Sequence, residues 1–159
     1  MEFYEIDLSP EKALLISVDT GDFDADASIE ELTLLAESAG AEVVGSIVQR
    51  KATPDGATYV GTGRLHEAEL FCHNQEIDII ICDGELTPSQ IRNIENATKV
   101  RVIDRTQLIL DIFALRAKTR EGKLQVELAQ LKYALPRLTG KGKQMSRLGG
   151  GIGTRGPGE

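Results

Sequence analysis

The sequence predicts an α/β protein, with a small parallel sheet flanked by helices, followed by a long coiled-coil-type helix and a Gly-rich basic tail. Short apolar runs alternate with segments whose apolar residues recur at helical spacing, which is typical of parallel strands joined by helices. Beyond residue 115 acidic residues become rare, and basic residues and glycines become frequent. We therefore divide the chain into an α/β subdomain at 1–115, a long helix at 116–138 and a Gly-rich basic loop at 139–159, called the basic segment below.

Apolar runs bounded by turn residues predict the strands. The main strands are expected at residues 13–18, 42–49, 77–82 and 100–103, with a short further strand at 58–60. Helical segments separate the four main strands, and such connections favour parallel pairing.

The helix after the first strand is expected to begin at Ser28, because Ser28 followed by Glu31 matches a capping box. The alternating acids at 22–26 favour a helix N-terminus. They do not match a calcium loop, since Ala27 stands where that loop needs glycine. Gly40 is expected to end the helix.

Three further helices are expected. The glycines at 61–63 open one that continues to about residue 74, and Thr87 caps the next, with Pro88 at its first position. Asp104 or Thr106 begins the last of the α/β subdomain. Its inward residues are expected to be Leu108, Ile109, Ile112, Phe113 and Leu115.

A leucine stripe marks the long helix. Its members recur at spacings of 4, 3 and 4, the seam of a coiled coil, and are Leu124, Leu128, Leu131 and Leu135. Pro136 is expected to end or kink this helix. Because an apolar stripe is costly to leave in water, we expect it to fold back on the α/β subdomain or to pair with the same helix of another copy.

Charge is divided unevenly along the chain. The net charge is −7, but residues 1–115 hold 22 acids and 8 bases, whereas residues 116–159 hold 10 bases and 3 acids. The two parts thus carry −14 and +7. This asymmetry is typical of a chain whose basic end contacts an anionic partner such as nucleic acid; the alternatives are that the two ends attract each other or face solvent.

Several classes of function find no support in the sequence. No apolar run approaches a membrane span and the acidic N-terminus lacks a signal peptide, so a cytoplasmic protein is expected. Cys72 and Cys82 are expected to be reduced, buried thiols. His66 and His73 are seven apart, not the four that ligands on one helix need. We predict no metal site and no catalytic residues.

Glycine motifs provide two weaker candidates. The pattern G-x-G-x-x-G at 151–156 follows a helix, whereas a dinucleotide site requires it to follow a strand. No P-loop pattern is present, so GTP hydrolysis is not expected of this segment.

The better candidate for a nucleotide or anion site consists of Gly61, Gly63, Arg64 and Asp83, since a helix N-terminus and a strand end converge there. A tight turn is the alternative. Asp83, Glu85 and Asp104 all fall at strand ends, where acids also cap helices.

The basic segment suits phosphate contacts, because it spreads basic side chains along a backbone that approaches closely. Eight glycines lie between residues 140 and 158. Lys141 and Lys143 are candidate RNA contacts, and Arg147 and Arg155 add the capacity to stack on unpaired bases. A linker to a further domain is the alternative.

Three stretches of the sequence match a known family: YVGTGRL at 59–65, DGELTPSQ at 83–90, and the long stretch from Arg105 through SRLGGGIGTRGPGE. In these stretches the chain resembles the N-terminal region of the HflX GTPases. It implies an α/β subdomain, two long antiparallel helices and a G domain that uses GTP and Mg²⁺. It also implies binding to the large (50S) ribosomal subunit and splitting or rescue of stalled ribosomes.

The resemblance assigns the rRNA contact to the loop between the two long helices. Its matching residues here are Arg147, Gly149, Gly150, Gly151, Gly153, Thr154, Arg155 and Gly156. The chain stops before the second helix and the G domain, so we expect a fragment without GTP hydrolysis. Two alternatives are an ATP-binding α/β domain, since an ATP-related activity is attributed to this region of the family, and a scaffold that positions the G domain.

Overall fold

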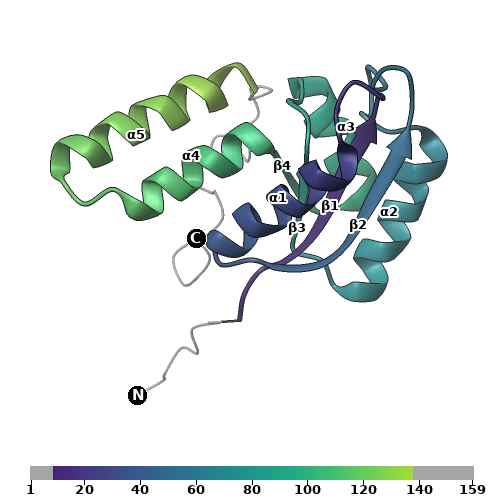
Figure 1. Ribbon diagram of the computed structural model, residues 1–159, viewed down its shortest axis with the longest axis horizontal. Helices are drawn as coiled ribbons and strands as arrows, with labels where there is room; N and C mark the ends of the chain where they lie inside the picture. The colour runs from purple at the N-terminus through teal and green to yellow at the C-terminus, as the bar shows by residue number, and fades with distance from the viewer. Residues whose placement is uncertain (1–8, 138–159) are drawn as a thin grey trace.

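Four parallel strands form one sheet in the order β2-β1-β3-β4 (Figure 1). The computed structural model describes residues 9–137. The strands are β1 (Lys12–Asp19), β2 (Glu42–Arg50), β3 (Ile79–Cys82) and β4 (Arg101–Asp104). The helices are α1 (Ala25–Ser38), α2 (Thr62–Gln75), α3 (Pro88–Thr98), α4 (Arg105–Arg116) and α5 (Arg120–Ala134), followed by the short 3₁₀ helix η1 (Leu135–Arg137).

Alternation along the strands builds a core on each face of the sheet. Leu14 and Ile80 point to the face covered by α2 and α3, whereas Leu15 and Ile81 point to the face covered by α1 and α4. All four side chains are fully buried. Side chains alternate between faces along a strand, so two-sided burial requires the continuous apolar runs seen in the sequence.

Most helices begin and end at capping residues that lie close to the helix end in the sequence. Thr87 caps α3, and the side chain of Gln90 completes a capping box with Pro88 in the first turn. Gly40, with φ +92°, follows Ala39, the C-cap of α1. Asp104 caps α4. These ends confirm the sequence-based expectations.

Three expectations for the α/β subdomain are wrong. Asp24, rather than Ser28, caps α1, because the Asp24 carboxylate accepts from the Ala27 N–H and the helix begins one turn earlier. Residues 58–60 form no strand, and only an isolated bridge joins Asp55 and Tyr59. Phe113 is exposed instead of facing the core, as is Leu115.

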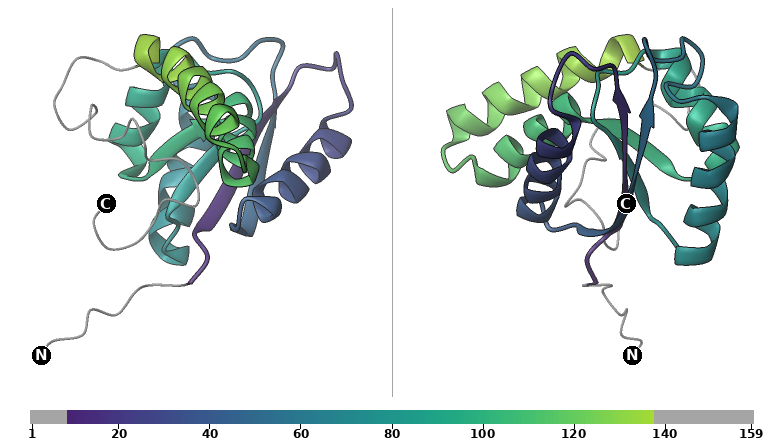
Figure 2. Two further views of the ribbon diagram at one scale, coloured as in Figure 1. Left: turned by 90° about the vertical axis from the view of Figure 1, so that its left-hand side faces the viewer. Right: turned by 45° about the vertical axis from the view of Figure 1, so that its right-hand side comes forward.

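Helix α5 lies along α4 and away from the sheet (Figure 2). Three leucines of its stripe do not fold back on the α/β subdomain, which is a further correction: Leu124, Leu128 and Leu135 are 56%, 47% and 53% exposed, whereas Leu131 is half-buried. The helix ends at Ala134, before Pro136, as expected. The basic segment lies outside the described residues, and so do all ten candidate RNA-contacting residues.

Candidate functional site

The carboxyl ends of β1 and β3 border a cavity. The chain leaves these neighbouring strands toward opposite faces of the sheet, and α/β proteins usually bind ligands at such a switch point. The cavity has a volume of about 360 Å³. It is lined by Val18, Thr20, Phe23, Ser28, Pro54, Tyr59, Asp83, Gly84, Glu85 and Arg105.

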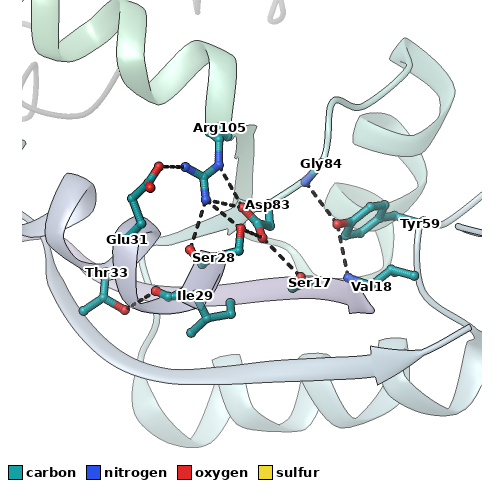
Figure 3. Close-up of polar contacts among 10 residues, drawn as sticks. All are labelled: Ser17, Val18, Ser28, Ile29, Glu31, Thr33, Tyr59, Asp83, Gly84 and Arg105. Atoms are coloured by element: carbon teal, nitrogen blue, oxygen red, sulfur yellow. Dashed lines mark hydrogen bonds and ion pairs between the residues drawn. The ribbon is translucent and has the colours of Figure 1, made fainter. Parts of the chain in front are cut away.

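Asp83 and Arg105 form the ionic centre of this cavity (Figure 3). The Arg105 Nε and Nη2 atoms donate to Asp83 Oδ1 at 2.8 and 2.6 Å. Ser17 and Ser28 donate their hydroxyls to Asp83 Oδ2 at 3.2 and 2.6 Å. The Asp83 side chain is only 4% exposed, so these four bonds replace the water that burial removes.

Arg105 is held from a second side by α1. Its Nη1 donates to Glu31 Oε1 at 2.6 Å and its Nη2 donates to the Ser28 carbonyl at 3.0 Å. Burial alone would lower the pKa of Arg105, but hydrogen bonds and attraction to Asp83 and Glu31 raise it above its ordinary value. Both Nη groups and Nε already have acceptors within the protein, so the guanidinium has little capacity left for an anion.

Tyr59 occupies the backbone donors at the switch point. Its hydroxyl accepts from the Val18 N–H at 3.2 Å and from the Gly84 N–H at 3.0 Å, which joins the ends of β1 and β3 (Figure 3). Tyr59 has a φ of 66°, a left-handed conformation that a bulky residue adopts only when its surroundings require it. Burial raises its pKa to about 12, so the hydroxyl stays neutral.

The cysteines near this region are unsuited to chemistry. Both are free and buried, as expected. Burial raises the pKa of Cys72 to about 11, and burial with the charges of Asp104 and Asp83 raises that of Cys82 further. A nucleophilic cysteine needs the opposite shift. Within residues 9–137, no group of His, Cys, Asp and Glu side chains could hold a metal ion.

The structure brings only one of the four candidate anion-binding residues to the cavity. Asp83 lines it, whereas Gly61, Gly63 and Arg64 are absent from its lining. The Gly61 N–H at the start of α2 donates to Gln49 Oε1 at 2.8 Å. Arg64 pairs with Glu67 on the exposed surface. Sequence reasoning missed Tyr59 and Arg105, although Arg105 follows a strand-end acid.

The strand-end acids Asp104 and Glu85 hold helical segments. Asp104 caps α4 and also accepts the Tyr133 hydroxyl of α5. Glu85 accepts from Arg137 Nη2 at 3.0 Å. The carboxyl edge of the sheet therefore holds the end of α5 as well as the cavity. No helix in the described part of the chain is long and apolar enough to span a bilayer.

This fold defines a small parallel α/β domain with an attached helical hairpin. Residues 26–114 match the family model described as the GTP-binding GTPase N-terminal region, and residues 116–159 match the GTP-binding GTPase middle region. The chain belongs to the HflX GTPase family.

Curated relatives carry the same family name. A GTPase HflX from Caldanaerobacter subterraneus subsp. tengcongensis is 53% identical over 98% of this chain and 36% of its own length. The GTPase HflX of Escherichia coli is 43% identical over 94% of this chain and 35% of its own length. The chain thus spans about a third of the relatives it matches.

Two solved structures of GTP-binding proteins are similar to this chain. A GTP-binding protein from Sulfolobus solfataricus in complex with GDP has a TM-score of 0.61 and 29% identity, over 87% of this chain and 40% of that one. A crystal structure of the SsGBP and GDP complex has a TM-score of 0.64 and 27% identity, with coverage of 87% and 41%.

Proposed function

We propose that this chain is the ribosome-binding region of an HflX-type GTPase, which associates with the large (50S) ribosomal subunit in the cytoplasm and splits or rescues stalled ribosomes. The basic segment contacts rRNA. The G domain, in longer members of the family, supplies GTP hydrolysis with Mg²⁺. Family membership supports the GTPase activity proposed for longer members. The features of this chain support its proposed role in binding RNA.

The charge asymmetry is the observation that carries the proposal. The acidic α/β subdomain has −14 and residues 116–159 have +7. On the described part of the basic end, the side chains point to solvent: Arg116, Lys118, Arg120, Lys123 and Lys132 are exposed. Basic groups on a surface attract the phosphates of RNA and release their counterions. The acidic subdomain would repel the same phosphates, so contact is directed to one end of the molecule.

Binding to purified large subunits over a range of salt concentrations tests this proposal. Removing one phosphate-binding side chain should flatten the slope of log affinity against log salt by roughly 0.7–0.9. Lys141→Ala with Lys143→Ala should therefore flatten it. Lys51→Ala with Lys99→Ala removes the same charge from the α/β subdomain and is the matched control. Equal slopes of log affinity against log salt for wild type and the first double variant would contradict the proposal.

Arg155 distinguishes recognition of folded rRNA from simple attraction. Arg has a planar fork that binds phosphate bidentately or stacks on a base, and Lys keeps only the charge. If the basic segment recognises rRNA, Arg155→Lys should lose most of the affinity that Arg155→Ala loses. The comparison belongs in a longer family member with its G domain, because a loop with one free end loses more entropy on binding. Wild-type affinity in Arg155→Ala would remove this residue from the site.

Nucleotide binding is the second candidate, favoured by the position of the cavity at the switch point. The contacts oppose it, since the Tyr59 hydroxyl occupies two backbone donors and Arg105 is already paired with two acids. Titration with labelled ATP and GTP should show no saturable binding to this chain. The scaffold alternative is tested by footprinting on large subunits with and without residues 140–159, which should differ only if those residues contact RNA.

A further inference from the structure

Helix α5 packs along α4, with Val126 and Ala129 half-buried, and polar contacts add to this packing. No residue of α5, the whole of which is described, is buried. On the side that faces α4, Gln130 Nε2 donates to Asp111 Oδ1 at 2.9 Å, and Gln107 of α4 donates to the same oxygen at 2.8 Å. Polar contacts are directional, so they fix the position of a helix more narrowly than an apolar stripe does.

The end of α5 is bound to a buried carboxylate. Asp104 is 1% exposed. Its Oδ1 accepts from the Gln107 N–H and its Oδ2 accepts from the Leu86 N–H, both at 3.0 Å. The Tyr133 hydroxyl donates a further short bond to Oδ2. Burial, this bond and the charge of Asp104 raise the pKa of Tyr133, so the hydroxyl keeps the proton that it donates.

Arg137 packs on Tyr133 and joins it to the β3–α3 loop. Its guanidinium lies over the Tyr133 ring at 3.6 Å from the centroid, a cation–π contact. Nη1 donates to the Tyr133 carbonyl at 2.9 Å and Nη2 to Glu85 at 3.0 Å. The Arg137 Nε–H is buried and finds no acceptor among the described residues. Because Arg137 contacts both the ring and the carbonyl of Tyr133, we expect the two residues to hold the end of α5 together.

These contacts join α5 to the loop that lines the cavity. Leu86 and Glu85 belong to the β3–α3 loop, and Glu85 is part of the cavity lining. The chain therefore leaves η1 at the carboxyl edge of the sheet, two residues before the basic segment begins. Two residues span at most ~7 Å, so the contacts that hold Arg137 set an upper limit on how far from it residue 139 can lie.

We propose that Tyr133 and Arg137 are positioning residues for RNA binding, which hold the end of α5 against Asp104 and Glu85 and thereby limit where the chain that follows Arg137 can begin. This inference rests on the proposed function. A segment with a fixed origin loses less freedom when it binds than one on a mobile helix. Positioning by Tyr133 does not depend on electrostatic attraction to RNA, because its side chain is uncharged.

The test uses the whole chain and two conservative variants. Tyr133→Phe removes one hydroxyl, and Arg137→Lys keeps the charge but loses the planar stacking and the fork. Hydrogen exchange of the α5 amides should rise roughly 5- to 30-fold in both, which is the expected size for one buried hydrogen bond. Exchange in β1 and β3 should stay as in wild type, which shows that the fold persists.

Affinity for purified large subunits gives the second measurement. Both variants should bind several-fold more weakly at every salt concentration, with the slope against salt unchanged, since both keep the charge of wild type. Lys132→Met is the matched control: Lys132 is an exposed neighbour on α5, and its replacement should change the slope and leave exchange of α5 unaltered.

The outcomes separate this inference from the proposed function. If wild type binds large subunits and Tyr133→Phe binds equally well, the positioning role is overturned although the proposed function stands. Weaker binding without faster exchange in α5 would also overturn it. If the unaltered chain shows no binding to large subunits, the proposed function fails and the positioning role fails with it.

Discussion

The α/β subdomain and helix α5 are held in place by different physics. The sheet and its covering helices share a core of fully buried side chains such as Leu14, Ile80 and Ile81. Helix α5 has no buried residue along its described length; it packs along α4 and is held in addition by hydrogen bonds of Gln130 and Tyr133, with Arg137 beyond its end. A core is lost or kept cooperatively, whereas a few polar contacts break locally. The subdomain can therefore remain folded while α5 changes its attachment.

The exposed leucines of α5 sharpen this contrast. Leu124, Leu128 and Leu135 are 56%, 47% and 53% exposed, while Gln130 and Tyr133 face α4 and the sheet edge. The apolar stripe thus contributes little to the fold of residues 9–137. It remains available to another helix, either from a longer family member or from a second copy of the chain.

The largest expected effect on the free energy of unfolding comes from a substitution in the core, which we compare with one in the leucine stripe. Ile80→Ala removes a fully buried side chain and should lower the free energy of unfolding by about 2–5 kcal/mol. Leu128→Ala, on the half-exposed stripe, should lower it by less than about 0.5 kcal/mol. Urea unfolding followed by circular dichroism measures both. Similar decreases for the two variants would remove the distinction between the regions.

The next effect concerns the ionic centre of the cavity. Arg105→Met should lower the free energy of unfolding by about 2–3 kcal/mol, because it leaves the buried Asp83 carboxylate without its cation. We place this below the usual range for buried pairs since Arg105 is 21% exposed. Glu31→Gln alters the same cluster at a carboxylate that is 68% exposed, and should change stability by less than about 1 kcal/mol. A larger decrease in Glu31→Gln than in Arg105→Met would contradict this account.

High pH should destabilise the subdomain through its buried thiols. Burial raises the pKa of Cys72 to about 11 from an ordinary value of 9.0, and that of Cys82 also rises. In the unfolded chain the thiols lose their protons near pH 9 and in the folded chain they do not, so stability falls as pH rises above about 9. At pH 10 each thiol should account for about 1 kcal/mol. Urea unfolding under reducing conditions at pH 8 and pH 10 measures this decrease, and Cys72→Ala should reduce it. A flat profile would refute the role of the thiols.

Self-association through the stripe has the smallest expected effect on unfolding. Wild type should form dimers as concentration rises, because burying a leucine gains roughly 1.5–3 kcal/mol. Leu128→Gln with Leu131→Gln should shift the chain to monomer and change the urea midpoint little. Analytical ultracentrifugation provides the measurement. A wild-type monomer at high concentration, with Leu128 freely accessible to solvent, would show that the stripe does not join two copies.

The sequence by itself determined the elements whose causes are local. Residues 79–82 are four consecutive apolar residues, and such a run suits only a strand covered on both faces. Thr87, Pro88 and Gln90 define a helix start within four positions, and Gly40 supplies the left-handed residue that ends α1. Burial pattern and cap chemistry sufficed here, because every partner lies within one turn or one strand.

Only the tertiary structure decided the parts that depend on distant partners. Ser28 fits a capping box by spacing, yet its hydroxyl is used by Asp83, 55 residues away, and Asp24 caps the helix instead. Tyr59 adopts a left-handed φ because its hydroxyl joins the ends of two strands. The leucine period correctly indicated a helix but not which face packs, since Asp104 and Asp111 draw the polar side of α5 inward. A buried carboxylate must be hydrogen-bonded wherever the fold places it, and no spacing along the chain reveals which residue will supply the donor.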